Sequence, residues 1–236
     1  MKLSASGQFT TYYAPFEHIN ENAKVVLCGI TPGIQQAVIA IRAAQAAIEK
    51  GLSQDEVLAI AKQTASFAGS MRKNLVAMLD HVGLHRYLGI QSTSALFGER
   101  ADLVHYTSAL RNPVLSNGKN YSGGANMARI DYLWQSASSG LKTEIDVLPN
   151  DAVFVPLGPS VDSVFERMVA ERVLERSRVL IGLPHPSGAN AERIAYFCER
   201  KDRAALSNKT NPDSLDQRRA LIIKCIRQLD RSSARA

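Results

Sequence analysis

The sequence predicts an α/β fold in which a mainly parallel sheet of four strands lies between layers of helices. Short apolar runs rich in β-branched residues alternate with longer segments of helical periodicity, a pattern typical of parallel α/β sheets. Four runs are expected to be buried strands: residues 24–28 (KVVLC), 103–108 (LVHYTS), 152–157 (AVFVPL) and 178–183 (RVLIGL). Ligands bind at the carboxyl ends of such strands, so the loops that follow these runs should share one edge of the sheet.

Three helical segments have readable apolar faces, because apolar residues recur three or four positions apart in each. The predicted stripes are Ile34, Ala37, Ile41, Ala44 and Ile48; Met71, Leu75, Met78, Leu79 and Val82; and Leu215, Ile222, Cys225, Ile226 and Leu229. The last helix should begin at Asn211-Pro212-Asp213, since Asn is a favoured N-cap and Pro is favoured in the first turn. Residues 116–125 (SNGKNYSGGA) are predicted to form a long polar loop, a kind of segment that is often functional.

Length and composition narrow the class of protein. At 236 residues the chain is expected to form one domain over residues 1–236, and its 45% hydrophobic content is enough for a core. No run approaches the roughly 18 apolar residues that span a bilayer, and the first residues (MKLSASGQFT) lack the apolar run of a signal peptide. We therefore expect a monomeric cytoplasmic protein, nucleoid-associated if bacterial, with no membrane contact.

Cysteine usage and charge bear on cofactors and partners. Cys28, Cys198 and Cys225 are scattered through apolar segments, which argues against a disulfide framework, a zinc site or an iron–sulfur cluster. No metal or cofactor is therefore expected. The net charge of +6 comes entirely from residues 171–236, which hold 14 basic and 8 acidic side chains. A one-sided basic region fits a polyanion partner, and it fits an ordinary solvated helix face equally well.

Two segments carry the residues best suited to chemistry. Gly29-Ile30-Thr31-Pro32-Gly33 follows the first predicted strand, where glycines permit close backbone approach and the next helix offers free N–H groups. His185 follows the last predicted strand and stands between two prolines, which restrict the backbone on both sides. Its imidazole is thus a rigid candidate donor to developing negative charge. Each segment taken alone is also compatible with a purely structural turn.

Together and in this order, the two segments resemble the paired motifs of the uracil-DNA glycosylase superfamily. GITPG at 29–33 is similar to the GINPG-type first motif, and HPSGAN at 185–190 is similar to the last motif, which begins HPS. SFAGS at 66–70 resembles the segment that stacks on the flipped base, and VPLGPS at 155–160 resembles the turn after the third strand. The resemblance covers residues 24–190 and implies a four-stranded parallel sheet between helices, with DNA containing uracil or related lesions as the partner.

The resemblance implies a role for each site residue. His185 would stabilise negative charge at the base O2, and Phe67 would stack on the base, although a core position suits Phe67 as well. Thr31 stands where the first motif has an Asn that orients water; a hydroxyl positions water but is not a base at neutral pH. Ser108 stands where an Asn usually reads the uracil edge, and Asn120 is the candidate to replace it.

The remaining assignments follow from the same resemblance. Gly29 and Ile30 would contribute further contacts to the base. The DNA contacts would come from Gly33, Ser160, Ser187, Gly188, Ala189, Asn190 and Arg193. Because Ala189 is small, weak insertion into the DNA stack is expected, with a preference for single strands or mispairs.

The sequence therefore predicts a monofunctional DNA-repair glycosylase that flips uracil or another damaged base out of DNA and hydrolyses its N-glycosidic bond. Nothing marks Lys119 as a desolvated Schiff-base nucleophile, so strand cleavage is not expected. Two alternatives stay open. One is a non-catalytic binder of damaged or single-stranded DNA, in which Thr31 and Ser108 record lost chemistry, and the other is an enzyme that hydrolyses free nucleosides.

Overall fold

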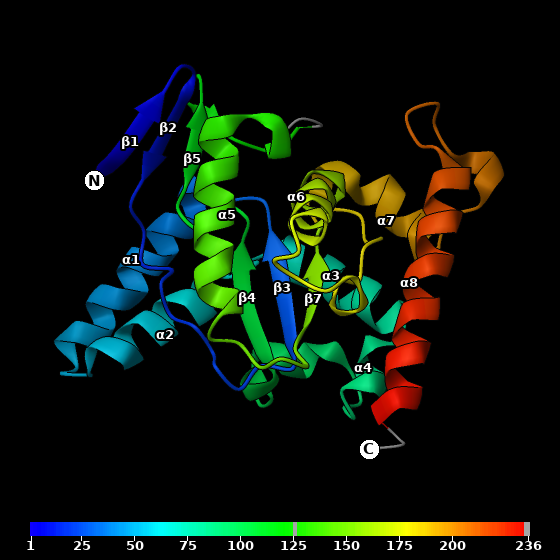
Figure 1. The fold of residues 1–236 in the computed structure, drawn as a ribbon, viewed down its shortest axis with the longest axis horizontal. Helices are drawn as coiled ribbons and strands as arrows, with labels where there is room; N and C mark the ends of the chain where they lie inside the picture. Colours follow the sequence, from blue (N-terminus) through cyan, green and yellow to red (C-terminus); the bar gives the residue numbers. More distant parts are fainter. Residues whose placement is uncertain (125–126, 234–236) are drawn as a thin grey trace.

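A parallel sheet of three strands forms the centre of the protein (Figure 1). The structure is a computed structural model that describes residues 1–124 and 127–233. The strands are β3 (Val25–Gly29), β4 (Val104–Ser108) and β7 (Val153–Pro156), in the order β4-β3-β7. They coincide with the first three apolar runs to within one residue at each end, and every residue of β3 is buried. The prediction of buried parallel strands is confirmed for these runs.

The fourth predicted strand, residues 178–183, is not a regular strand. It meets β7 and the residue after it only through two isolated parallel bridges, Phe154 with Val179 and Leu157 with Leu183. Gly182 has a φ of +145°, and a Cβ built there would lie 2.7 Å from the carbonyl oxygen of Arg218 in helix α8 (Pro212–Ser233). The close approach of that helix requires glycine, and the positive φ interrupts the regular ladder. The four-stranded prediction is therefore corrected to three strands plus a bridged segment.

Helices cover both faces of the sheet, which confirms the α/β class. Alternate residues of β3 point to opposite faces, Val25 and Leu27 into one apolar cluster and Val26 and Cys28 into another. The first cluster includes residues of α3 (Ser70–His81), α4 (Leu84–Tyr87), α7 (Ala191–Phe197) and α8. The second includes residues of α5 (Asp131–Ile145) and α6 (Pro159–Ala170).

Helices α1 (Ile34–Glu49) and α2 (Gln54–Ala65) pack against each other on the β4 side of the sheet (Figure 1). The buried residues of α1 are all alanines: Ala37, Ala40, Ala44 and Ala47. The predicted stripe is therefore wrong at its isoleucines, since Ile34 and Ile41 are each 40% exposed and Ile48 is 63% exposed. Alanine lets two helix backbones approach closely, and this contact selects the small face over the larger apolar one.

The other two predicted helical stripes are confirmed. Leu75, Met78 and Leu79 of α3 are buried, as are Leu215, Ile222 and Ile226 of α8, while Met71, Cys225 and Leu229 are partly buried against the same cluster. Helix α8 begins at Pro212, and the Ser214 N–H donates to Asn211 Oδ1 at 3.1 Å. Asn211 is thus the predicted N-cap.

A second, antiparallel sheet was not predicted. It consists of β1 (Lys2–Ser6), β2 (Phe9–Tyr12), β5 (Val114–Ser116) and β6 (Lys119–Asn120), in that order. The expected loop 116–125 is therefore a hairpin in its first half, with positive φ at Asn117 and Gly118 as a tight two-residue turn requires. Its last residue, Ala125, lies outside the described residues.

Short 3₁₀ helices complete the secondary structure: Thr93–Phe97, Ala101–Leu103, Met127–Arg129, Arg176–Arg178, Gly188–Asn190 and Arg203–Ala205. Among the described residues, no helix is long and apolar enough to cross a membrane.

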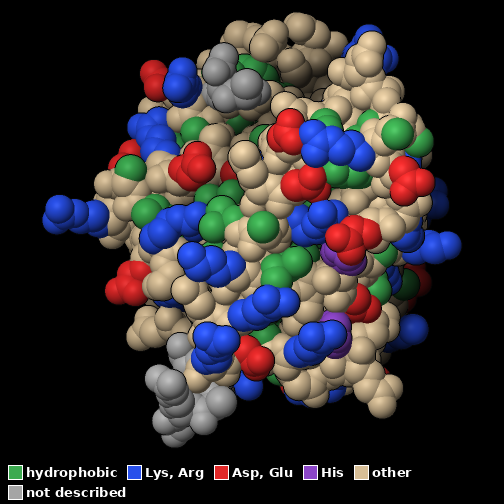
Figure 2. Space-filling view, turned by 90° about the vertical axis from the view of Figure 1, so that its right-hand side faces the viewer, with side chains coloured by type: hydrophobic (Ala, Val, Ile, Leu, Met, Phe, Trp, Pro, Cys, Tyr) green, Lys and Arg blue, Asp and Glu red, His purple; other side chains and the backbone are tan. Residues whose placement is uncertain are grey.

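Four of the basic C-terminal residues, Lys201, Arg203, Arg218 and Arg219, pair with acidic side chains. Arg218 pairs with Asp162, Arg219 Nη2 lies 2.9 Å from Asp216 Oδ1, and Lys201 Nζ lies 2.8 Å from Glu192 Oε1. Figure 2 shows Lys and Arg side chains interspersed with Asp and Glu over this face of the molecule. Some of the basic residues in this region are therefore already paired with acidic residues of the protein itself.

Candidate active site

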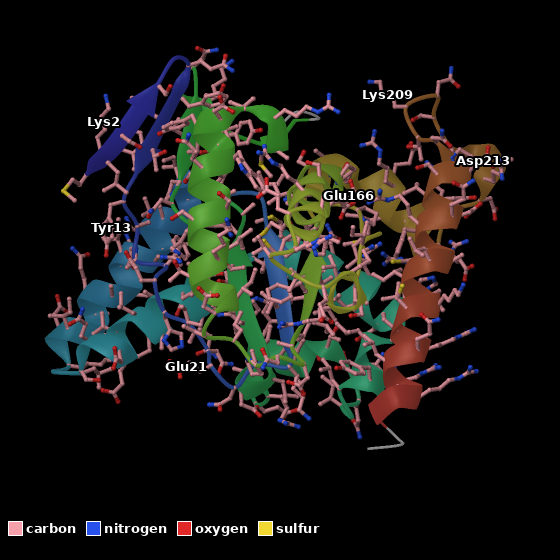
Figure 3. All side chains as sticks on the ribbon, in the orientation of Figure 1. Lys2, Tyr13, Glu21, Glu166, Lys209 and Asp213 are labelled. Carbon is pink, nitrogen blue, oxygen red and sulfur yellow. The ribbon has the colours of Figure 1, made fainter. Side chains whose placement is uncertain are left out.

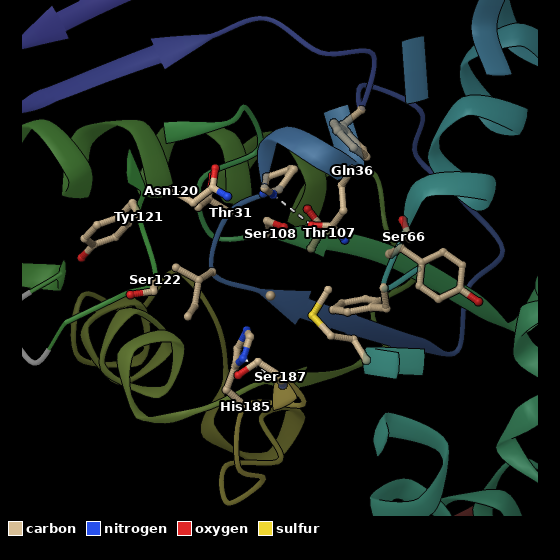
Figure 4. A pocket seen from close by; sticks show the side chains of 18 of the residues that line it. Thr31, Gln36, Ser66, Thr107, Ser108, Asn120, Tyr121, Ser122, His185 and Ser187 are labelled. Carbon is tan, nitrogen blue, oxygen red and sulfur yellow. Dashed lines mark hydrogen bonds between the residues drawn. The ribbon is translucent and has the colours of Figure 1, made fainter. Parts of the chain in front are cut away.

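The two predicted turns line one cavity of about 450 Å³ at the carboxyl edge of the parallel sheet. This volume is within the usual range for small-molecule sites, roughly 300–1,000 Å³. Figure 4 shows Thr31 and Asn120 across the cavity from His185 and Ser187. Of the residues assigned from the sequence, the cavity is lined by Gly29, Ile30, Thr31, Gly33, Phe67, Ser108, Asn120, His185, Ser187, Ala189 and Asn190.

His185 is held as a neutral hydrogen-bond donor. The Ser187 N–H donates to His185 Nδ1 at 3.3 Å, so a neutral ring carries its proton on Nε2. Burial lowers the pKa of His185 to about 4, which keeps the imidazole uncharged at neutral pH. Gly158 permits this placement, because a Cβ there would lie 2.9 Å from His185 Cβ.

Thr31 ties the first turn to the antiparallel sheet. Its Oγ1 donates to the Asn112 carbonyl at 2.9 Å and accepts from the Val114 N–H at 3.1 Å. A hydroxyl has one proton and two lone pairs, so one lone pair of Thr31 is left to accept a hydrogen bond from water. Thr31 can thus orient a water molecule through its oxygen, while its hydroxyl proton is already donated to the Asn112 carbonyl.

Phe67 forms part of the cavity wall in an unusual backbone conformation. Its φ is +51°, the left-handed region that a bulky side chain rarely adopts. A Cβ at Gly29 would lie 3.4 Å from Phe67 Cε1, so the glycine leaves room for the ring. The ring is 7% exposed and contacts the Tyr106 ring edge-on, with centroids 6.1 Å apart. Phe67 therefore belongs both to the core and to the cavity.

Ser108 and Asn120 enter the cavity from different sheets. Ser108 ends β4, and its Oγ would lie 3.5 Å from a Cβ at Gly29. Asn120 ends β6, where its Oδ1 accepts from the Ile34 N–H at 3.1 Å at the start of α1. This bond orients the amide, and Asn120 Nδ2 remains as a donor toward the cavity side.

Three of the assigned DNA-binding residues do not line the cavity. Ser160 lies in the first turn of α6, where a Cβ at Gly123 would come 2.7 Å from its Oγ. Arg193 donates to Asn190 Oδ1 at 2.7 Å and to the Lys209 carbonyl at 2.9 Å. Figure 3 shows Lys209 at the tip of the loop before α8, at the end of the molecule toward which the parallel strands point. Arg193 thus links this loop to Asn190. Gly188 lies exposed in the short helix Gly188–Asn190.

A buried charged cluster that was not predicted from the sequence lies at the wall of the cavity and behind it. Glu144 of α5 accepts from Thr107 Oγ1 at 3.0 Å, and the same Oε1 lies 3.4 Å from Arg111 Nε. His105 Nε2 lies 3.4 Å from Glu144 Oε2. Lys62 of α2 is 3% exposed and donates to the His18 carbonyl at 2.6 Å. No motif marks these residues, because a lysine in an amphipathic helix is normally solvated.

Burial and mutual contact set the charge states of this cluster. Burial lowers the pKa of Lys62 to about 8 and that of His105 to about 4. Burial alone would raise the pKa of Glu144, but the close contact with His105 and the charge of Lys62 outweigh it and lower the pKa to about 2. At neutral pH the cluster therefore holds an anionic Glu144, a neutral His105 and the cations Lys62 and Arg111.

The fold and this cavity define an α/β protein with a cavity of mixed polar and apolar lining at the carboxyl edge of a parallel sheet. Sequence comparison shows to which family it belongs. The chain is 35% identical over 204 residues to the protein of Bacillus subtilis (strain 168) named "Uncharacterized protein YoxB", a match that covers 86% of this chain and 80% of YoxB. The chain therefore belongs to the family of YoxB. No family model matches the sequence, and no solved structure matches it.

Proposed function

We propose that this protein is a monofunctional DNA glycosylase that flips uracil or a related damaged base out of DNA and hydrolyses its N-glycosidic bond. One observation carries the proposal. The two turns that resemble the uracil-DNA glycosylase motifs, around Thr31 and His185, line the same cavity together with Phe67, Ser108 and Asn120. The proposal implies a glycosylase-like fold in which residues 178–183 take the place of the fourth strand.

His185 supplies the donor that the reaction needs. Breaking the bond leaves negative charge on the departing base, and a preorganised N–H aimed at its carbonyl oxygen stabilises that charge. The Ser187 N–H fixes the tautomer, and the lowered pKa keeps the ring neutral, so Nε2–H is available at physiological pH. Such a donor contributes on the order of 10²–10³ in rate.

The other cavity residues hold the base and the water. The strained Phe67 offers an aromatic wall for stacking, and Asn120 Nδ2 donates to the base edge while its Oδ1 stays bound to Ile34. Thr31 accepts a hydrogen bond from the attacking water through its remaining lone pair. The loop that carries Ser187 and Asn190 lies at the cavity, where the phosphates beside a flipped nucleotide would pass.

A second candidate is a non-catalytic binder of damaged or single-stranded DNA. The observation that favours it is that the Thr31 hydroxyl already donates its proton to the Asn112 carbonyl. In addition, no carboxylate lines the cavity in the described part of the chain. A binder needs the base pocket and needs no group that accepts a proton from water.

An incubation with uracil-containing and matched plain oligonucleotides, followed by alkali, separates the candidates. Alkali-labile breaks at uracil indicate a glycosylase, because an abasic site breaks in alkali. A retarded band that stays intact after alkali indicates a binder only. Turnover of free nucleosides with little salt-dependent affinity for DNA would instead indicate a nucleoside hydrolase.

A further inference from the structure

Two cations face the proposed base pocket, and the acids that accompany them lie behind. Lys62 and Arg111 line the cavity. Glu144 and Glu17, the two carboxylates whose charges act on Lys62, are absent from its lining. Glu144 contacts two residues of the cavity wall, Thr107, which donates to it, and Arg111, whose Nε lies 3.4 Å away. The two cations of the cluster therefore belong to the cavity wall, whereas its two acids do not.

The charge of Lys62 is not neutralised by a direct ion pair. Its Nζ donates to the neutral carbonyl of His18, and within the described ranges no carboxylate oxygen lies in ion-pair distance of it. Arg111 differs, because its Nε lies 3.4 Å from Glu144 Oε1 while its Nη2 donates to the Gly140 carbonyl at 3.2 Å. Buried charges are costly unless they are compensated. A buried lysine without a direct ion pair, beside a second cation at the same cavity, therefore indicates a ligand that carries or develops negative charge.

We propose that Lys62 and Arg111 stabilise the base as it leaves as an anion, an inference that rests on the proposed function. In the step, the C1′–N1 bond breaks and its electron pair stays on N1 of the base. Water then forms a bond to C1′ and releases one proton to solvent, and the base takes a proton from solvent after it leaves. His185 is neutral and offers only a dipole, so the cationic groups of the cavity wall are these two residues.

The exclusion of water from a buried site strengthens the attraction between these cations and an anionic base. In a site with little water, the interaction between opposite charges several ångströms apart is much stronger than in bulk water. Removing one such stabilising group from a preorganised site typically lowers the rate on the order of 100-fold. A purely structural lysine would not respond to the acidity of the leaving base, and this difference allows a test.

The test compares release of uracil and of 5-fluorouracil from otherwise identical oligonucleotides in single-turnover reactions. Fluorine makes the leaving anion more stable, so the rate of 5-fluorouracil release should depend less on Lys62 and Arg111. We expect Lys62→Met to slow uracil release on the order of 100-fold and 5-fluorouracil release by a smaller factor. The rate of 5-fluorouracil release divided by the rate of uracil release should therefore rise several-fold. Arg111→Met should shift the ratio in the same direction. Lys62→Arg keeps the charge and should keep the parent's ratio.

The control is Lys142→Met, an exposed lysine on the same helix as Glu144, which should leave both rates unchanged. Equal slowing of both bases in Lys62→Met and in Arg111→Met would overturn the inference while leaving the glycosylase intact. No release of either base by the parent protein would instead overturn the proposed function, and this inference with it.

A pH profile keeps the inference testable should the methionine variants fail to fold. Because burial lowers the pKa of Lys62 to about 8, its charge is present below that pH and is lost above it. Uracil release by the parent should therefore decline as pH rises through about 8, and the decline should move to higher pH in Lys62→Arg. Identical profiles would contradict the role of Lys62. The charged or titratable groups around Lys62 are Glu17, His18, Cys28, His105, Arg111 and Glu144.

Discussion

At the residue scale, the environment of His185 prepares it for donation more than for proton transfer. An imidazole whose pKa is about 4 is a poor acid–base catalyst at neutral pH, but it is a stable N–H donor. The bond from the Ser187 N–H leaves only Nε2 to carry the proton. The prolines on either side of His185 were visible in the sequence, whereas the tautomer and the lowered pKa come from the folded surroundings.

His185→Ala should lose most base-removal activity and keep its affinity for DNA. We expect the single-turnover rate to fall on the order of 10²–10³, since one preorganised donor is lost. Gel retardation should show little change, because the phosphate contacts come from other residues. His81→Ala is the matched control, since His81 ends α3 and does not line the cavity. Equal rates for the variant and the parent would remove His185 from this role.

Phe67→Leu should weaken base capture with a small effect on folding. Leucine keeps an apolar side chain in a position that is 7% exposed, so the cost in unfolding free energy should be about 1 kcal/mol. The flat face for stacking is lost. Binding to a uracil-containing single strand should weaken several-fold, while binding to a plain strand stays as it was. A large drop in melting temperature with unchanged uracil preference would show that Phe67 serves only the core.

At the scale of elements, contacts between helices decide features that periodicity alone cannot. The apolar pattern of α1 fits two faces, one with isoleucines and one with alanines, and packing against α2 selects the alanines. The run at 178–183 has the composition of a strand, but α8 packs against it at Gly182 and breaks its regularity. By contrast, α3 and α8 have one apolar face each, and their buried sides followed from sequence.

Gly182→Ala should destabilise the protein through the contact with α8. A Cβ at this position would meet the Arg218 carbonyl at 2.7 Å, and the φ of +145° is unfavourable for alanine. We expect a loss of about 2 kcal/mol or more in unfolding free energy, and thus a melting temperature lower by roughly 4–8 °C. Gly188→Ala is the control, since a Cβ there meets nothing within 4 Å. Equal melting temperatures for the two variants would contradict the packing argument.

At the scale of the whole molecule, stability should fall in mild acid. Burial lowers the pKa of both His105 and His185 to about 4, below the unfolded value of about 6.5. Between these values the unfolded chain binds more protons, so stability present above about pH 6.5 is lost as pH falls through this window. Burial raises the pKa of Asp162 to about 6, which acts in the opposite direction and offsets part of the loss.

Thermal unfolding followed by circular dichroism at several pH values tests this balance. We expect a melting temperature roughly 5 °C lower at pH 4.5 than at pH 7, because two histidines outweigh one carboxyl. His185→Gln should show a shallower pH dependence than the parent, since it lacks one of the two groups. A melting temperature that stays level or rises toward pH 4.5 would contradict the buried, neutral state of these histidines.

The sequence by itself determined what depends on neighbours along the chain. Runs of apolar β-branched residues predicted four strands, of which three form the parallel sheet. Single apolar faces predicted the packing of α3 and α8, and the cap at Asn211 predicted where the last helix begins. Because parallel strands present their carboxyl ends at one edge, it also predicted that the turns at Thr31 and His185 would meet.

Only the tertiary structure decided what depends on residues far apart in the chain. The broken strand at Gly182, the alanine face of α1 and the hairpin that carries Asn120 each require a partner from another part of the fold. The same holds for Lys62, Arg111 and Glu144, which no motif connects. Burial and pKa are properties of the packed surroundings and not of the residue type, so this charged wall of the pocket is visible only in the folded molecule.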